Sequence, residues 1–214
     1  MLRNAVADRV GELLAACARA ADRRLDALGL APPALDLPPQ VRADLDAFFA
    51  GTIDLAAVVI RRGHVPGVPH PRAFALPGLI YLGADTGIVG VSVGTGPGAV
   101  RQRATPTLVH ELVHIWQGRF LGPRYVIRAL GEQIRLGRRA YDWRAILESA
   151  AHERARLAFP VEAHAQLVSD AYAAGHGFAP AAALSRRDRH PAAVDDVLTR
   201  LRAGDASTLR GRTV

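Results

Sequence analysis

The first part of the chain carries apolar residues at helical spacing, interrupted at intervals by charged ones. Residues 2–28 predict one long amphipathic helix, which Gly29 ends. A second, shorter helix is predicted to open at Pro38 and Pro39 and to run to Phe49, because proline is favoured in the first turn of a helix. The chain therefore begins with two helices before any strand pattern is visible.

The middle of the chain changes to short apolar runs that are rich in β-branched residues. Such runs predict strands, and the glycine-rich or proline-rich stretches between them predict loops and turns. The strands are predicted at residues 52–60, 78–82 and 87–93, and the stretches 64–71 and 94–104 are predicted to be irregular.

From Thr105 the pattern is helical almost to the end of the chain. Thr105 is a suitable N-cap, and Pro106 is a suitable first helical residue. Strands followed by helices indicate an α+β domain and not alternating βαβ units. Helices are predicted from Pro106 to about Leu121 and at residues 123–137, 142–157, 161–174 and 190–203, with a frayed tail from Gly204.

A chain of 214 residues, half of them hydrophobic, can bury one substantial core. We predict an N-terminal helical segment over residues 1–50 that packs on the domain, and a core over residues 51–175. A C-terminal helix and its tail are predicted over residues 176–214. The core is expected to hold a short antiparallel or mixed sheet, followed by a mainly helical C-terminal half.

The net charge of +7 suggests an acidic partner, but the distribution of that charge does not support one. All 27 basic residues are arginines, and they are scattered along the chain. No stripe of alternating aromatic and basic residues, of the kind that stacks bases, is visible. We therefore do not expect nucleic acid as the main partner.

The apolar segments argue against a membrane span and against a classical export signal. The most apolar region, residues 73–100, is broken by Pro77, Asp85 and several glycines, so it is predicted not to cross a membrane. Charged residues interrupt the first helix too often for a signal peptide, which indicates a cytoplasmic protein or export without a leader. Cys17 is the only cysteine, which excludes an intrachain disulfide and a cysteine-based zinc site.

The segment LVHELVHIWQ, residues 108–117, is apolar in character yet contains two histidines, a glutamate and a glutamine. Buried polar groups cost free energy unless something satisfies them. His110 and His114 lie four residues apart, so both imidazoles project from one face of a helix and can bind one metal ion. Glu111 lies about 100° around the helix from His110, where it can act as a general base without occupying a coordination position. Gln117 returns to the histidine face.

A catalytic zinc site needs a third protein ligand. Gln117 and Phe120 stand where a metzincin would have a glycine and its third histidine, which excludes that class. Glu162 is predicted as the third ligand, because small Ala163 and Ala165 beside it would let two helices come close. His152 and His164 remain the alternatives, whereas Glu148 and Glu153 are expected to be solvated or packed polar residues.

At this point the chain resembles gluzincin-type zinc metallopeptidases. It is most similar to small bacterial peptidase-like domains that carry an H-E-L-T-H-V-x-Q helix and are linked to contractile injection systems and toxins. The resemblance spans about residues 72–173. It rests on HELVHIWQ at 110–117, AFALPGLIYLG at 73–83 and PVEAHAQLVSDAY at 160–172.

The resemblance implies a zincin-like fold that hydrolyses peptide bonds with a zinc-activated water. Zn²⁺ would be bound by His110, His114 and Glu162, with Glu111 as the general base. One position departs from the family pattern. Gluzincins often place an aspartate four residues after the glutamate ligand, but this chain has Gln166, which can orient a histidine without adding negative charge. Zinc affinity or turnover is therefore expected to be lower.

Such peptidases usually hold the substrate as an added strand along the edge of a sheet. Residues 79–82 or 89–93 are the expected edge in this chain. Tyr141 and Tyr172 are the candidates for a second electrophile, although a structural role explains each ring better.

Two further features are interpreted as not functional, or at most peripheral. Residues 94–99 match the pattern GxGxxA, but nearby prolines leave no room for the helix that a dinucleotide site requires. This segment is predicted to be a loop and is a candidate lid at the mouth of the cleft. His64 and His70 lie in a proline-rich stretch and are expected at the surface.

The leading hypothesis is a zinc-dependent endopeptidase that acts on a peptide or protein substrate. The alternative is a zincin-fold interaction or targeting module that hydrolyses little or nothing. The intact Glu111 favours the enzyme, because a structural site has no use for a base beside two ligands. The neutral Gln166 favours the alternative. The sequence indicates no oligomeric state.

Overall fold

The computed structural model describes residues 2–67, 72–92, 100–153, 158–176 and 190–209. It confirms an α+β fold in which helices predominate and the sheets are small. The α-helices are α1 (Leu2–Ala27), α2 (Pro39–Phe49), α3 (Pro106–Leu121), α4 (Arg124–Leu136), α5 (Trp143–Glu153), α6 (Val161–Ala173) and α8 (Pro191–Arg202). The short 3₁₀ turns are η1 (Leu55–Ala57), η2 (Gly137–Tyr141) and η3 (Ala206–Leu209).

The strands form a three-stranded mixed sheet and a separate hairpin. In the sheet, β3 (Leu79–Tyr81) pairs in parallel with β1 (Val59–Arg61) and antiparallel with β2 (Phe74–Leu76). The hairpin consists of β4 (Ile88–Ser92) and β5 (Val100–Ala104). The expectation that residues 79–82 form an open edge is therefore wrong. All three residues of β3 are buried, as is usual for a central strand. The outer strands are β1 and β2; an isolated bridge joins β1 to Ala34, and β3 is the only described strand that pairs with β2.

Most predicted helices are confirmed to within a few residues, whereas the strands differ more. Residues 52–60 do not form one strand, because Asp54 accepts a hydrogen bond from the amide of Ala56 and starts η1 instead. Residues 94–104 were predicted to be irregular, but β5 forms at their end. A frayed tail was predicted from Gly204, but η3 forms within it. In η3, Leu209 is buried in the core, so the chain is still packed there.

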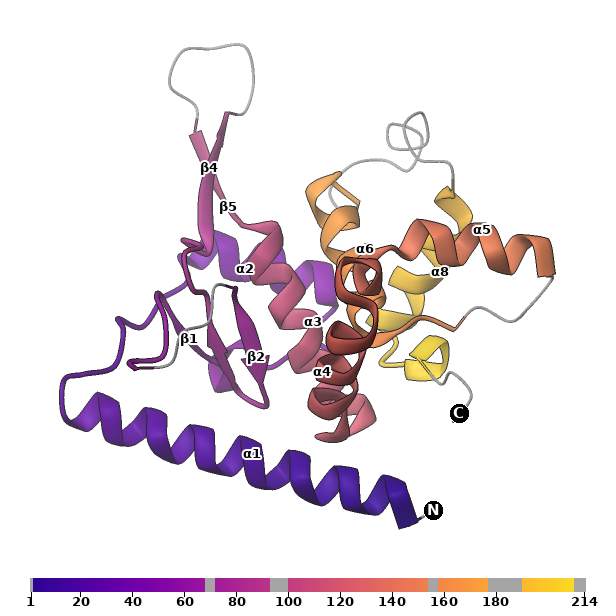
Figure 1. Cartoon of the computed structure of the whole chain (residues 1–214). Helices are drawn as coiled ribbons and strands as arrows, with labels where there is room; N and C mark the ends of the chain where they lie inside the picture. The colour runs from indigo at the N-terminus through magenta and orange to yellow at the C-terminus, as the bar shows by residue number, and fades with distance from the viewer. Residues whose placement is uncertain (1, 68–71, 93–99, 154–157, 177–189, 210–214) are drawn as a thin grey trace.

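The hydrophobic core lies around α3, with strands on one side and α4, α6 and α8 on the other (Figure 1). Ala163 and Ala165 on α6 are completely buried and let α6 lie against α3. The indole of Trp116 on α3 donates a 3.0 Å hydrogen bond to the carbonyl of Leu201 on α8. Buried residues from α2 to η3 belong to the same core, so the C-terminal segment is part of one domain.

Helix α1 lies along one side of the molecule and packs on α4 (Figure 1). Contacts with α4 and with the sheet hold this helix against the rest of the chain. Between α1 and the three-stranded sheet lies a group of buried polar side chains, Asp22, Arg61 and Tyr81, which we call the α1 cluster. Arg61 donates two 3.0 Å hydrogen bonds to the Asp22 carboxylate, and Tyr81 donates a third of 2.7 Å. This cluster joins α1 to the three-stranded sheet.

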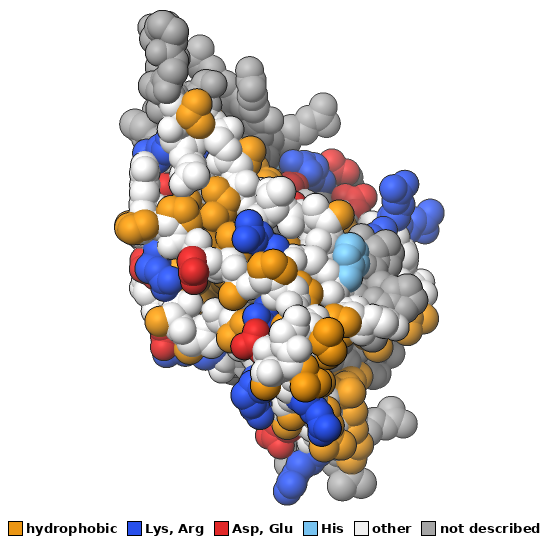
Figure 2. All heavy atoms as spheres, turned by 90° about the vertical axis from the view of Figure 1, so that its left-hand side faces the viewer, with side chains coloured by type: hydrophobic (Ala, Val, Ile, Leu, Met, Phe, Trp, Pro, Cys, Tyr) orange, Lys and Arg blue, Asp and Glu red, His pale blue; other side chains and the backbone are white. Residues whose placement is uncertain are grey.

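Charges of both signs are mixed on the face of the molecule that Figure 2 shows, with hydrophobic side chains between them. That face therefore carries no continuous basic surface of the kind that binds a nucleic-acid backbone. Among the described helices, none is long and apolar enough to cross a membrane.

Candidate metal centre

Helix α3 holds His110, Glu111 and His114 in place within the core. The hydroxyl of Thr105 accepts a hydrogen bond of 3.2 Å from the amide of Leu108, and Pro106 occupies the first turn. Apolar neighbours bury the helix on most of its surface, so the polar side chains are enclosed as well. The side chains of His110 and His114 are only 11% and 7% exposed.

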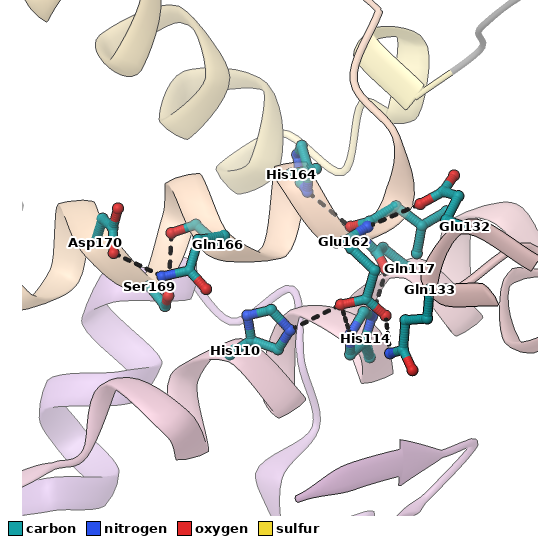
Figure 3. Close-up of polar contacts among 11 residues, drawn as sticks. His110, His114, Gln117, Glu132, Gln133, Glu162, His164, Gln166, Ser169 and Asp170 are labelled. Carbon is teal, nitrogen blue, oxygen red and sulfur yellow. Dashed lines mark hydrogen bonds and ion pairs between the residues drawn. The ribbon is translucent and has the colours of Figure 1, made fainter. Parts of the chain in front are cut away.

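Helix α6 brings Glu162 to the two imidazoles, and we call His110, His114 and Glu162 the metal centre (Figure 3). The Oε2 atom of Glu162 lies 3.2 Å from Nε2 of His110 and 3.5 Å from Nε2 of His114. One potential ligand atom from each residue lies within 4.8 Å of the other two. The three buried residues can therefore hold one metal ion.

Two of the three separations between potential ligand atoms are compatible with a shared ion. A tetrahedral ion with ligands at about 2.0–2.1 Å separates neighbouring ligand atoms by about 3.3 Å. Hydrogen bonds between an imidazolium and a carboxylate are usually shorter, about 2.7–2.9 Å. The distances of 3.2 and 3.5 Å in the metal centre are close to the first value.

Gln117 fixes the tautomer of His114. Its amide nitrogen donates a 3.0 Å hydrogen bond to the carbonyl of Val161, so its oxygen must face the other way. That oxygen lies 2.8 Å from Nδ1 of His114, which must therefore carry the proton. The other nitrogen, Nε2, faces Glu162 and can bind a metal ion when it carries no proton.

The interaction predicted for Gln166 is different in the structure. Its amide donates a 2.8 Å hydrogen bond to Asp170 on the same helix, and not to a histidine of the metal centre. Gln117 performs the orienting task instead, from the same helix as the two histidines. The helical spacing predicts Gln117 on the histidine face, but it does not predict the contact with Nδ1 of His114.

Charge interactions at the metal centre couple Glu162 to the two histidines. Burial alone would raise the pKa of Glu162, but hydrogen bonds and charge from His110 and His114 lower it well below its ordinary range. Burial would also lower the pKa of His114, yet Glu162 raises it to about 9. Without an ion, the carboxylate is therefore stabilised by a protonated imidazole, and a metal ion would take the place of that proton.

Glu111 is buried beside the metal centre without being part of it. Burial raises the pKa of its carboxyl group, the two histidines oppose that rise, and Glu162 adds to it. Its Oε2 atom is buried and has no hydrogen-bond partner among the described residues. A buried acceptor without a partner costs free energy, which points to a partner supplied by a ligand or by water.

A cleft opens at the metal centre between β2 and α4. One cavity of about 470 Å³ contains the three metal-centre residues and Glu111 in its wall, together with β2 and the apolar face of α4. A second cavity of about 530 Å³ continues from His110 towards the first turn of α3. Arg72 and Tyr141 contribute to both cavities, so they stand where the two meet.

Tyr125 closes the inner wall of the cleft. Its ring stacks on His114 with centroids 6.0 Å apart, and its hydroxyl donates a 3.1 Å hydrogen bond to the carbonyl of Ala75 in β2. Gly118 makes this position possible, because a Cβ atom there would lie 2.9 Å from the Tyr125 ring. The sequence analysis missed Tyr125, since nothing in a single tyrosine after a proline indicates such a contact.

The two tyrosines proposed from sequence lie in different places. Tyr141 lines the cleft, with its ring centroid 5.8 Å from that of His110, and burial raises the pKa of its hydroxyl. Tyr172 packs edge-on against Phe48 and lies under the guanidinium of Arg103, away from the residues that line the cleft. Tyr172 is therefore a structural ring.

The remaining sequence candidates stay outside the metal centre. His164 is buried against Trp116, and burial together with the charge of His114 lowers its pKa to about 3, so it is neutral. Glu148 and His64 are exposed. The side chains of His152 and Glu153, together with His70 and residues 94–99, lie outside the described part of the chain.

Two residues of α4 that the sequence analysis did not consider also contact Glu162. Gln133 donates a 2.7 Å hydrogen bond to Oε1 of Glu162, and Glu132 accepts one of 3.1 Å from its backbone amide (Figure 3). Their separation from Glu162 by about 30 residues gives no signal in the sequence.

Comparisons of the chain with protein-family models, with curated proteins and with solved structures found no match.

Proposed function

We propose that the protein is a zinc-dependent endopeptidase in which His110, His114 and Glu162 bind Zn²⁺ and Glu111 is the general base. The observation that carries this proposal is the metal centre itself, in which one carboxylate oxygen lies within 3.5 Å of both imidazole nitrogens and all three potential ligand atoms lie within 4.8 Å of one another. Beside it stands Glu111, whose buried Oε2 atom has no hydrogen-bond partner among the described residues.

Zinc is the metal that suits this donor set best. Two imidazole nitrogens and one carboxylate oxygen are ligands that zinc accepts readily, whereas Ca²⁺ and Mg²⁺ prefer sites made of oxygen alone. Three protein ligands leave the fourth position of a tetrahedral ion open, which is typical of catalytic sites and not of structural ones.

When bound, zinc would lower the pKa of a coordinated water towards about 7 and polarise the carbonyl of the substrate. Glu111 would accept the proton of the attacking water and deliver it to the leaving amine. Its raised pKa favours this role, because a base whose pKa approaches the working pH can both take and return a proton. Gln117 would keep the Nε2 atom of His114 directed at the ion.

The substrate would lie extended along the open edge of β2. This strand forms the wall of the cleft opposite α4, and β3 is its only partner among the described strands. A peptide backbone could pair with the free edge and place its carbonyl near the metal centre. The hydroxyl of Tyr141 and the guanidinium of Arg72 line this cleft, and both are suited to stabilise negative charge that develops on that carbonyl.

One observation favours a binding module without strong hydrolysis as the second candidate. The carbonyl of Ala75, which a substrate strand would use, already accepts the hydroxyl of Tyr125. A peptide would then gain fewer hydrogen bonds along β2 than on a fully open edge.

Metal content and hydrolysis together test the two candidates. We expect purified wild-type protein to hold about one zinc per chain, to lose it in Glu162→Ala, and to cleave casein or itself. Glu111→Gln should keep zinc but lose at least about a hundredfold in rate, since general-base catalysis contributes about 10²–10⁴-fold. Zinc binding without hydrolysis in wild type would favour the binding module. A wild-type protein that binds no zinc would exclude the peptidase and leave only the binding module.

A further inference from the structure

The strongest unexplained feature near the metal centre is the contact of α4 with Glu162. Two consecutive residues of α4 bind two different parts of this one residue (Figure 3). Gln133 contacts the side chain, and Glu132 contacts the backbone. Neither residue belongs to the metal centre, and neither has a role in the catalytic mechanism proposed above.

We propose that Gln133 is a positioning residue that keeps Glu162 a monodentate ligand and thereby keeps the fourth position of the ion open. This inference rests on the proposed zinc site. A glutamate can bind a metal through one oxygen or through both. Binding through both would occupy the position that water or a substrate carbonyl needs.

The two oxygens of Glu162 are already divided between different partners. Oε2 faces both imidazoles, at 3.2 and 3.5 Å. Oε1 accepts the amide of Gln133 at 2.7 Å, which is short for a hydrogen bond from nitrogen. Because the Glu162 carboxylate is 1% exposed, little water can replace that donor. Turning Oε1 towards an ion would break this bond.

Glu132 supports the arrangement from the backbone side. The start of α6 has no side-chain cap of its own, because Pro160 stands at the N-cap position. The carboxylate of Glu132 accepts hydrogen bonds from the first amides of α6, those of Val161 and Glu162. It therefore replaces the missing cap and fixes the backbone from which the Glu162 side chain departs.

Substitution of Glu132 and substitution of Gln133 are expected to affect different properties of the protein. Glu132 holds a helix end, so its removal should lower the stability of the fold as well as zinc affinity. Gln133 holds one side-chain oxygen near the rim of the cleft, so its removal should change the metal centre while leaving the fold stable. Gln133 is therefore the sharper test of positioning.

The test compares Gln133→Met with Gln133→Lys in the full-length protein. Methionine has a similar shape but no N–H group, whereas lysine keeps a donor. Ile134→Ala is the matched control, because Ile134 is the next residue on α4, is 78% exposed and lies outside the cleft wall. Zinc affinity is measured by competition with a chromophoric chelator, and the visible spectrum of the Co²⁺-substituted protein reports coordination number.

We expect Gln133→Met to bind zinc about 10–100-fold more weakly, the usual effect of losing a partner of a metal ligand. Its Co²⁺ spectrum should lose intensity, as a four-coordinate ion becomes five-coordinate. Gln133→Lys should stay close to wild type in both measurements, and Ile134→Ala should match wild type. Unchanged affinity and spectrum in Gln133→Met would overturn the inference, and so would equal losses in the methionine and lysine variants.

These outcomes are separable from a failure of the proposed peptidase activity. Zinc binding without hydrolysis in wild type would reject the peptidase, while the affinity and the Co²⁺ spectrum would still decide the role of Gln133. Hydrolysis by wild type together with an unaffected Gln133→Met would reject the role of Gln133 alone.

Discussion

The chain buries two polar clusters that look similar in composition and differ in their charge balance. In the α1 cluster, the single carboxylate of Asp22 accepts hydrogen bonds from a permanent cation, Arg61, and from Tyr81. The second cluster is the metal centre together with Glu111. It has two carboxylates, those of Glu111 and Glu162; His110 and His114 lower the pKa of both, and Arg72 lines the same cleft.

The two clusters also differ in what holds their carboxylates in the charged form. Burial would raise the pKa of Asp22, but the hydrogen bonds from Arg61 and Tyr81 lower it, so the α1 cluster is satisfied as an ion pair. At the metal centre, the Glu162 carboxylate interacts with two histidines that can lose their protons, and Oε2 of Glu111 has no hydrogen-bond partner among the described residues. The α1 cluster thus contains a permanent cation, whereas the Glu162 carboxylate is held by titratable imidazoles and by the neutral amide of Gln133.

Removing the anion of the α1 cluster should produce the largest loss of stability. Asp22→Ala leaves the Arg61 guanidinium buried with only the exposed carboxylate of Asp26 as a charged partner. Breaking a buried ion pair costs about 3–5 kcal/mol, and urea unfolding would measure that loss. The loss should be the same with and without zinc, because this cluster needs no metal.

Asp26→Ala is the matched control for this prediction. Asp26 also contacts Arg61, at 2.8 Å, but its side chain is 59% exposed. Exposed ion pairs contribute about 0–1 kcal/mol. Equal effects of the two substitutions would mean that burial does not distinguish these partners.

Raising the pH should weaken the metal-free protein through His114. The pKa of His114 is raised from 6.5 to about 9 in the folded state, so the folded state binds this proton more tightly than the unfolded chain does. The resulting stability is present below about pH 6.5 and is lost as the pH rises to about 9. Its upper limit is about 3 kcal/mol. Chemical denaturation in a chelator between pH 6 and 9.5 would measure it.

Zinc should reverse this trend, because an ion binds the deprotonated imidazole. The same series with saturating Zn²⁺ is therefore expected to show little loss up to pH 9. The pKa of Glu162 is lowered in the folded state, so the stability that its carboxylate contributes is lost as the pH falls into the acid range and not as it rises. A metal-free protein whose stability stays constant from pH 6 to 9.5 would contradict the proposed protonation of His114.

The sequence predicts the local parts of the metal centre well, for a physical reason. His110, Glu111 and His114 lie within one turn or so of one helix, so their spacing fixes their relative directions. Glu162 could be proposed because three protein ligands were required and small residues beside it allowed a second helix to approach. The structure places Glu162 at the two imidazoles.

The sheet order and the supporting contacts could not be predicted in this way. Strands of three residues carry too little alternation to show which of them is central, and so β3 was taken for an edge. Asp22 lies 39 residues from Arg61 and 59 from Tyr81, and such a separation leaves no periodic signal. Gln166 was predicted to orient a histidine of the metal centre, but its amide binds Asp170, which lies one turn further along the same helix. Gln117 orients His114 instead.

The smallest expected effect concerns Glu111, whose buried Oε2 atom has no hydrogen-bond partner among the described residues. The pKa of Glu111 is raised, chiefly by burial, so ionising it in the folded protein costs stability that increases as the pH rises. Glu111→Gln keeps the shape without the charge and should stabilise the metal-free protein by about 1 kcal/mol at pH 8, with little gain at pH 4.5, where the carboxyl is protonated. Urea unfolding at both pH values would measure the difference, with Glu148→Gln on the exposed face of α5 as the control. A gain of equal size at both pH values would show that the charge is not the cause. A gain confined to pH 8, together with lost hydrolysis, would mean that the chain keeps a destabilising acid at this position because the reaction needs it.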